Sequence, residues 1–309
     1  MMQAASTRTR LTIGDILHIL ELRTKIVSVS SFLIGTAYAL AVSGYLSPLR
    51  CVLMLVATVC IDLGTAGFNS YYDYKHGVDQ PDTDWERYKV LVQSDLDPRL
   101  AFRLACAMFA LAAIPGLALG IAVGWEVVAV GVASMAVSYL YSGGPSPLSR
   151  TAVGEMFAGG MLGSVLVALS TYVQLETLPL GALLVGLPST FIIAAILAVN
   201  NACDVHGDAR GGRRTLAIVV GPEWARRYVY ALVAAAYIAA FTLIAVGVIA
   251  ESSWLPLSAG ALVAVLEFAR MRVSGFSHQT KATAMAGISR AFLAYTLSML
   301  LALALSKGG

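Results

Sequence analysis

Long apolar segments separated by short polar ones make up most of the chain after residue 25. A helix needs about 20 predominantly apolar residues to cross the hydrocarbon core of a bilayer. Ile26–Gly44 meets this criterion without a charged residue, and Cys51–Phe68 carries only Asp62. Seven further segments are predicted to span the membrane: Leu104–Val123, Val127–Gly143, Thr151–Leu175, Thr177–Val199, Tyr228–Ala250, Leu255–Ala269 and Ala282–Ser306. The pattern predicts an all-α polytopic membrane protein, with nine transmembrane helices in a single domain of residues 1–309.

The composition agrees with this prediction, since 58% of the 309 residues are hydrophobic and 13% are charged. Soluble domains have about 45–50% apolar and about 25% charged residues. The net charge of +3 carries little information, and no nucleic-acid partner is expected. The four cysteines show no paired spacing, so we expect free thiols and neither a zinc site nor disulfides: Cys51, Cys60, Cys106 and Cys203. The polar segment 1–25 precedes a span long enough to stay in the membrane, so no cleavable signal peptide is expected.

Basic residues gather on one side of the predicted bundle. They lie in the N-terminal segment and near the loops after the second, fourth, sixth and eighth helices: Arg8, Arg10, Arg23, Lys25, Lys75, Arg87, Lys89, Arg99, Arg103, Arg150, Arg210, Arg213, Arg214, Arg226, Arg227, Arg270, Arg272 and Lys281. The alternate loops hold only Arg50, and Lys307 follows the last helix. By the positive-inside rule, the N-terminus and the four basic loops are cytoplasmic. Without a recognisable transit peptide, the plasma (inner) membrane is the expected location.

Two acidic motifs follow the second and sixth predicted helices. The first, "NSYYDYKHGVDQPDTD", contains Asp73, Asp79, Asp82 and Asp84. Asn69 and Asp73 are four residues apart and share one face of a helix end. Gly77 then breaks the helix, so that Asp79 can fold back toward the same point. In the second motif, "NNACDVHGDARGGRRTLAIVVG", residues Asn200, Asp204 and Asp208 repeat this spacing. The repetition suggests an internal duplication of four-helix units.

Carboxylates crowded at a membrane surface repel one another, and burying them is costly unless a cation joins them. Mg²⁺ usually binds one or two carboxylates together with substrate phosphates. Two facing Asp motifs therefore suit two or more Mg²⁺ ions that bridge one diphosphate. Nearby basic residues would bind the remaining phosphate oxygens: Lys75, Lys89, Arg210, Arg213 and Arg214. A single acidic loop is often merely solvated, but two matching motifs on one side favour the metal site.

These motifs resemble those of the UbiA superfamily of intramembrane prenyltransferases. "NSYYDYKHGVD" and "KVLV" (Lys89–Val92) are similar to the branch that prenylates 1,4-dihydroxy-2-naphthoate for menaquinone synthesis and to its animal relative that makes vitamin K2. "YSGGPSPLSRTAVGEMFAGGMLGSVLVALSTYVQ" (Tyr141–Gln174) and "GGRRTLAIVVG" extend the resemblance over most of the chain. The chain departs from the family pattern at three places. Ser70 stands where many members have Asp, and "LRTK" (Leu22–Lys25) stands where many have Arg-Pro. Gly77 stands where a strict form of the first motif has Asp, and Asp79, two residues later, replaces that Asp.

The resemblance implies a residue set for the site. The metal and catalytic residues would be Asn69, Asp73, Asp79, Asn200, Asp204 and Asp208. Arg213 takes the place of a basic family residue after the second motif, and Arg150 lies near one before the fifth helix.

The resemblance also implies a reaction, which is Mg²⁺-dependent transfer of a polyprenyl group from an allylic diphosphate to an aromatic acceptor. Mg²⁺ and basic groups would weaken the allylic C–O bond, and apolar walls would protect the carbocation from water. The ring then attacks, and in the dihydroxynaphthoate case the attacked carbon loses its carboxylate as CO₂. The isoprenoid tail would lie in a groove open to lipid. The expected partners are therefore a polyprenyl diphosphate, a small aromatic molecule and the lipid bilayer.

Other polar residues near the predicted site have two interpretations each. Asp62, inside a span, would orient a ligand or the aromatic substrate, or would be a satisfied bundle contact. Glu155 would recognise substrate or favour a helix N-terminus. Four tyrosines would stabilise a cation or belong to an interfacial aromatic belt: Tyr71, Tyr72, Tyr139 and Tyr141. Glu267 and Arg290 are expected to pair across the last two helices.

Rival functions remain open on the sequence. Internal repeats and intramembrane polar residues also mark secondary transporters, although these bind their substrates near the bilayer centre. Within the superfamily, the acceptor could be 4-hydroxybenzoate, homogentisate, chlorophyllide or a specialised metabolite, and a terpene cyclase is a further alternative.

Overall fold

The computed structural model describes residues 8, 10–21, 25–79, 89–94 and 96–306. Over these residues the regular structure is helical, apart from an isolated bridge between Arg8 and Leu96. Nine helical segments of this described part are long and apolar enough to span a membrane, which confirms the prediction. Six of them are single helices: α2 (Ile26–Ser43), α3 (Pro48–Lys75), α5 (Arg99–Ala122), α6 (Trp125–Ser142), α9 (Leu180–Cys203) and α12 (Pro222–Ala245). The other three are composite: α7 (Gly154–Gly159) with η3 (Gly160–Val165) and α8 (Leu166–Leu175), η4 (Glu251–Ser253) with α13 (Trp254–Ser274), and η5 (His278–Thr280) with α14 (Lys281–Leu305).

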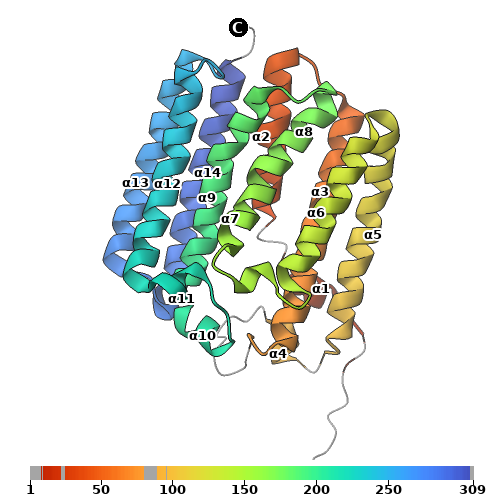
Figure 1. The fold of residues 1–309 in the computed structure, drawn as a ribbon, viewed down its shortest axis with the longest axis vertical. Helices are drawn as coiled ribbons and strands as arrows, with labels where there is room; N and C mark the ends of the chain where they lie inside the picture. Colours follow the sequence, from red (N-terminus) through yellow and green to blue (C-terminus); the bar gives the residue numbers. More distant parts are fainter. Residues whose placement is uncertain (1–7, 9, 22–24, 80–88, 95, 307–309) are drawn as a thin grey trace, which may run out of the picture.

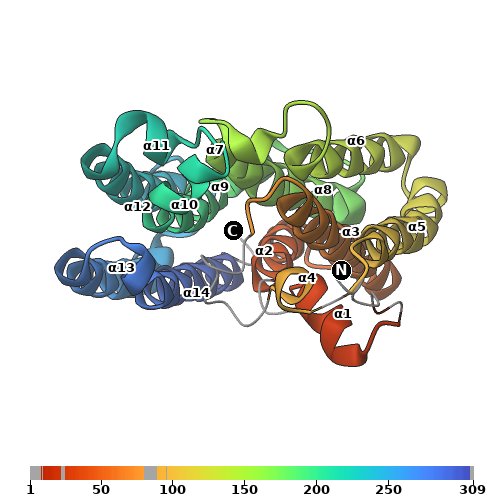
Figure 2. The same ribbon diagram turned by 90° about the horizontal axis from the view of Figure 1, so that it is seen from below.

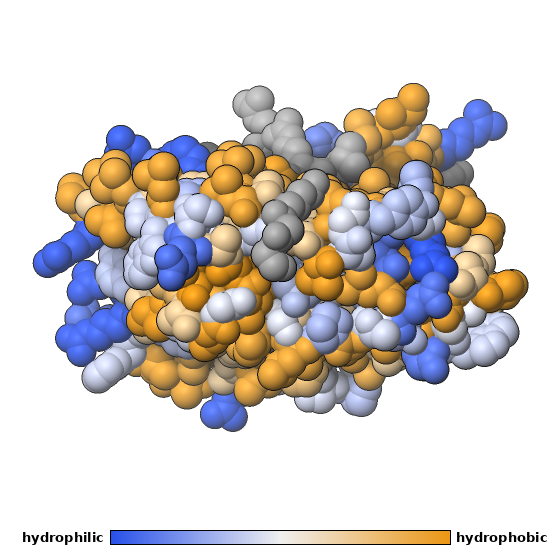
Figure 3. Space-filling view, turned by 90° about the horizontal axis from the view of Figure 1, so that it is seen from above, coloured by the Kyte–Doolittle hydropathy of each residue, from blue (hydrophilic) through white to orange (hydrophobic). Residues whose placement is uncertain are grey.

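The long helices stand side by side, with short helices at one end (Figure 1). The short ones are α1 (Ile13–Ile19), α4 (Val90–Gln93), α10 (Val205–Arg210) and α11 (Leu216–Val220). Figure 2 shows them lying across the lower ends of the bundle, which we call the motif end. Figure 3 looks onto the opposite end, where hydrophilic residues are scattered among apolar ones.

Several helices extend beyond the predicted spans. The second was predicted to end at Phe68, but α3 continues to Lys75 and carries the first acidic motif. Its 28 residues correspond to about 42 Å, whereas the hydrocarbon core is about 30 Å thick. The seventh was predicted from Tyr228, but α12 begins at Pro222. Hydropathy misses such helical turns because their side chains are polar enough to lie outside the hydrocarbon.

Helix α9 lies at the centre of the bundle and packs against α12, α7, α14 and α2 (Figure 2). Its buried face is rich in small residues, namely Ala194, Ala195, Ala198 and Ala202. Small side chains let membrane helices approach closely. Opposite this face, the turn η3 (Gly160–Val165) is a π-helix, and the Ser164 amide donates to Thr190 Oγ1 at 3.1 Å.

Charged residues in or beside the spans have partners that explain their positions. Arg290 Nη2 lies 2.7 Å from Glu267 Oε2, which confirms the predicted pair between α14 and α13. Arg50, the basic residue on the opposite side, donates to the carbonyl oxygens of Ala122 and Val173 and pairs with Glu176. Since helix C-termini carry unpaired carbonyls and partial negative charge, a basic residue here has a structural role.

The close contact between η3 and α9 gives a stability prediction. A methyl group at Gly163 would overlap the backbone nitrogen of Thr190, whereas one at Gly160 would meet nothing within 4 Å. Gly163→Ala should therefore destabilise the protein by about 1–3 kcal/mol, seen as a lower Tm in detergent, and Gly160→Ala should not. Equal Tm values for the two variants would contradict this packing.

Candidate functional site

A cavity of about 1410 Å³ runs from the motif end into the bundle, and we call it the central cavity. All six predicted metal residues line it: Asn69, Asp73, Asp79, Asn200, Asp204 and Asp208. Further in, the walls are mainly apolar and come from α3, α5, α6, α8 and α9, as far as Leu119 and Val127 near the α5–α6 turn. The central cavity therefore has a polar end, at the two motifs, and a long apolar interior.

The first motif is shaped by the last turns of α3 and the turn that follows. Asn69 Nδ2 donates to Asp73 Oδ2 at 3.1 Å, and Ser142 Oγ donates to Asn69 Oδ1 at 3.0 Å. Gly77 then takes a left-handed conformation with φ of 67°, which glycine adopts without steric cost. The chain turns back, so that the Asp79 amide donates to the Asp73 carbonyl at 3.3 Å.

The second motif surrounds the end of α9. Asp204 is the residue between α9 and α10, and the Asp208 amide donates to its carbonyl oxygen at 2.9 Å. Asp208 is buried, with 4% of its surface exposed. Gly212, with φ of 71°, then turns the chain, and the Arg213 amide donates to the Asp208 carbonyl at 2.9 Å. This turn places the Arg213 side chain between the two motifs.

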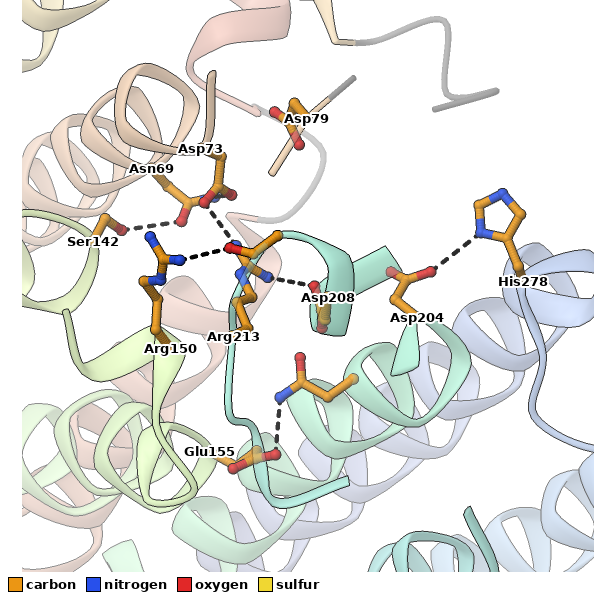
Figure 4. A network of polar contacts seen from close by, with 12 residues as sticks. Asn69, Asp73, Asp79, Ser142, Arg150, Glu155, Asp204, Asp208, Arg213 and His278 are labelled. Atoms are coloured by element: carbon orange, nitrogen blue, oxygen red, sulfur yellow. Dashed lines mark hydrogen bonds and ion pairs between the residues drawn. The ribbon is translucent and has the colours of Figure 1, made fainter. Parts of the chain in front are cut away.

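Arg213 joins the motifs directly (Figure 4). Its Nη2 lies 2.7 Å from Asp73 Oδ1 and its Nη1 lies 3.0 Å from Asp208 Oδ1. Burial lowers the pKa of Arg213, but Asp73 and Asp208 raise it by more, so the guanidinium stays charged. Burial also raises the pKa of Asp208 to about 6, against the opposing effect of Arg213. One guanidinium therefore does not fully compensate the desolvation of this carboxylate.

Further cations contact the remaining motif carboxylates. Lys89 Nζ lies 2.9 Å from Asp79 Oδ1, and Lys281 Nζ lies 2.7 Å from Asp204 Oδ2. His278 Nδ1 is 3.3 Å from Asp204 Oδ1 (Figure 4). Burial lowers the pKa of Lys89, but Asp79 and Asp73 raise it by more. The sequence alone does not reveal the roles of Lys281 and His278, because only the packing of α14 beside α9 brings them to Asp204.

The structure divides the predicted diphosphate-binding residues into two groups. Lys89, Arg210 and Arg213 line the central cavity. Arg150 instead donates from Nη2 to the Gly211 carbonyl at 2.6 Å, and its own carbonyl accepts from the Arg214 amide at 2.8 Å, so it braces the Gly-Gly-Arg turn. The Lys75 ammonium lies over the Tyr71 and Tyr72 rings, 5.7 and 5.8 Å from their centroids. Six residues named above lie outside the described residues: Leu22, Arg23, Asp82, Asp84, Arg87 and Lys307.

The residues predicted to form an acceptor or cation pocket also fall into two groups, those that line the central cavity and those that lie beside it. Asp62 and Tyr141 line the central cavity. Tyr72 and Tyr139 hydrogen-bond to each other at 2.7 Å and pack with Phe68 in an aromatic cluster beside it. Glu155 is 1% exposed and accepts a hydrogen bond of 2.8 Å from Asn201, which lines the cavity (Figure 4).

The donor set at the polar end fits Mg²⁺. Carboxylate and amide oxygens are the hard ligands that this ion prefers. Within the described ranges no three His, Cys, Asp or Glu residues form a ready-made metal cluster. Asp208 Oδ2 is buried and has no hydrogen-bond partner in the described part of the chain. The residues that would hold the ion are Asp73, Asp79, Asp204 and Asp208.

Comparison with known proteins identifies the family. The pattern of the UbiA prenyltransferase family matches residues 28–304, most of the chain. The chain belongs to the UbiA prenyltransferase family. It is 34% identical over 202 residues to a 1,4-dihydroxy-2-naphthoate octaprenyltransferase of Bacillus subtilis (strain 168), which covers 65% of this chain and 64% of that protein. It is 26% identical over 200 residues to UbiA prenyltransferase domain-containing protein 1 of Homo sapiens, covering 64% and 58%. These matches span less than two-thirds of each relative's length.

Solved UbiA structures share the fold of this family member. A UbiA homolog from Aeropyrum pernix K1 superposes with a TM-score of 0.68 and 17% identity, over 90% of this chain and 98% of that one. A UbiA homolog from Archaeoglobus fulgidus bound to GPP and Mg²⁺ gives a TM-score of 0.58 and 19% identity, over 93% and 99%. At such identities the likeness concerns the fold alone, and it confirms the predicted fold class.

The bridge between the motifs gives a second stability prediction. Arg213→Ala would leave two buried carboxylates without their shared cation, which typically costs about 3–5 kcal/mol. The matched control is Arg226→Ala, which breaks an exposed ion pair with Glu223 and should cost less than about 1 kcal/mol. Thermal unfolding in metal-free detergent should therefore show a much larger fall in Tm for Arg213→Ala. Similar Tm values would contradict the bridge.

Proposed function

We propose that this protein transfers a polyprenyl group from an allylic polyprenyl diphosphate to an aromatic acceptor, and that the acceptor is 1,4-dihydroxy-2-naphthoate in menaquinone synthesis. One observation carries the proposal: the Asp residues of both motifs and the cations that contact them share the polar end of a long apolar cavity. The diphosphate belongs at the polar end, and the prenyl chain belongs in the apolar interior.

The protein's own groups have distinct roles at the polar end. The ammonium groups of Lys89 and Lys281 and the Arg213 guanidinium lie beside the motif carboxylates, where they can also attract phosphate oxygens. When bound, Mg²⁺ supplies Lewis-acid stabilisation of charge on the leaving diphosphate. The allylic C–O bond breaks with its electron pair remaining on the diphosphate.

The interior of the central cavity protects the allylic carbon from water. Its walls include Phe157, Met161, Leu166, Leu169 and Ile193, which offer no hydrogen bonds to water. Water exclusion favours attack by the ring carbon over hydrolysis. A bond then forms between the ring and the allylic carbon, and the ring loses its carboxylate as CO₂.

The acceptor assignment is supported by similarity. Relatives from Bacillus subtilis (strain 168) and Mycobacterium tuberculosis (strain ATCC 25618 / H37Rv), 34% and 29% identical, are 1,4-dihydroxy-2-naphthoate octaprenyltransferases. We further propose that the protein lies in the plasma membrane with the motif end in the cytoplasm, since the basic residues near the two motifs gather at that end.

Prenyl transfer should require both motifs. Asp73→Asn and Asp204→Asn each remove a negative oxygen ligand and should lower the rate of transfer to 1,4-dihydroxy-2-naphthoate by at least about 100-fold, as should removal of Mg²⁺ with EDTA. The measurement is radiolabel transfer from polyprenyl diphosphate in detergent or nanodiscs. Glu223→Gln, an exposed carboxylate in an ion pair on α12, is the control and should keep wild-type activity. Undiminished transfer in either Asp variant would contradict the proposal.

The orientation can be tested with single cysteines placed in a variant that lacks the four native ones. Ser252→Cys and Gln279→Cys lie at exposed positions at opposite ends of α13 (Trp254–Ser274). In intact cells a membrane-impermeant maleimide should label Cys at 252 and reach 279 only after permeabilisation. The reverse pattern would overturn the proposed sidedness.

A further inference from the structure

An ion pair between a buried lysine and a half-buried aspartate lies in the wall of the central cavity, away from the two motifs. Lys25, at the start of α2, donates from Nζ to Asp62 Oδ1 at 2.8 Å and to the Asp62 carbonyl at 3.2 Å. Ser28 Oγ donates to Asp62 Oδ2 at 2.6 Å. The Lys25 side chain is 8% exposed and that of Asp62 is 17% exposed, and all three residues line the central cavity.

Stability does not account for such a pair. Removing two charges from water often costs more than their attraction returns, so apolar residues would serve the packing of α2 on α3 at least as well. Ionisable residues inside a membrane span usually mark a functional site. The diphosphate chemistry does not use this pair, because Asp62 lies seven residues before Asn69 on α3, which is about 10 Å deeper along the helix.

The pair still has hydrogen-bonding capacity for a ligand. An ammonium has three N–H donors, and the contacts of Lys25 within the described residues use two acceptors, both on Asp62. An ionised carboxylate offers about four lone-pair positions, and Lys25 and Ser28 occupy two of those on Asp62. A positively charged hydrogen-bond donor and a hydrogen-bond acceptor therefore lie side by side in the cavity wall.

We propose that Lys25, held by Asp62, binds the carboxylate of an aromatic acid acceptor, and that Asp62 accepts a hydrogen bond from a hydroxyl next to that carboxylate. The inference rests on the proposed function, and it identifies the side chains that select the aromatic acceptor of the proposed reaction. Asp62 and Asn69 are two turns apart on nearly one face of α3, so a ring anchored at Lys25 lies between the anchor and the diphosphate. One cation shared by two carboxylates is also the arrangement of Arg213 with Asp73 and Asp208.

The test compares ligands with and without the carboxylate. Equilibrium binding of 1,4-dihydroxy-2-naphthoate and of 1,4-dihydroxynaphthalene is measured on the full chain in nanodiscs. The wild-type protein should bind the acid about tenfold or more tightly than the diol, as expected for a hydrogen bond to a charged group. In the double variant Lys25→Gln/Asp62→Asn, which leaves no uncompensated charge, the two affinities should become equal.

Two controls separate this role from others. Mg²⁺-dependent binding of polyprenyl diphosphate should be unchanged in the double variant, which also shows that the variant is folded. Arg226→Gln, which removes an exposed charge on α12, should keep the wild-type preference for the acid. A preference for the acid that survives in the double variant, or that is absent from the wild-type protein, overturns the inference. A parallel loss of polyprenyl diphosphate binding also overturns it.

The measurements distinguish a failure of the proposed reaction from a failure of the proposed role of Lys25. A wild-type protein that prefers the acid and binds polyprenyl diphosphate, yet transfers no prenyl group to 1,4-dihydroxy-2-naphthoate, contradicts the proposed reaction and supports the role of Lys25. Transfer without any preference for the acid contradicts the role of Lys25 and supports the reaction.

Discussion

One buried guanidinium holds together two carboxylates that would otherwise repel each other. Arg213 lies between Asp73 at the end of α3 and Asp208 in α10, and the rest of the site depends on this contact. It brings the ends of α3 and α9, which are distant in sequence, to one end of one cavity. Burial raises the pKa of Asp208 despite its contact with Arg213, and its Oδ2 atom has no hydrogen-bond partner in the described part of the chain. A further cation beside this carboxylate would therefore stabilise its charged form.

The separation of charge and apolar surface along the bundle explains how such a site can work inside a membrane. Cations and carboxylates gather at the motif end, where Lys89 and Lys281 complete the pairing. The interior of the central cavity is mainly apolar, and the pair of Lys25 and Asp62 is an exception in its wall. A substrate with a charged head, a reactive carbon and a long apolar chain matches this order of environments.

The sequence predicts the fold well because hydropathy and helix length are local properties. The nine spans and the single-face spacing of Asn69 with Asp73 follow from them, whereas the polar ends of α3 and α12 were missed. The sequence does not predict the contacts of Arg213, Lys281 and Lys25, since each depends on helices packing across the bundle. The hydrogen bond from Arg150 to the Gly211 carbonyl is likewise not predicted, and the binding of Arg150 to the diphosphate stays a prediction. The internal duplication stays a prediction.

In our proposal, carboxylates of both motifs hold divalent metal around one diphosphate. The test is anomalous diffraction from crystals grown with Mn²⁺ and a non-hydrolysable polyprenyl thiodiphosphate. We expect metal peaks at coordination distance from Asp73 or Asp79 and from Asp204 or Asp208, with the thiodiphosphate between them. Metal bound by one motif alone, or a thiodiphosphate bound away from both, would contradict it.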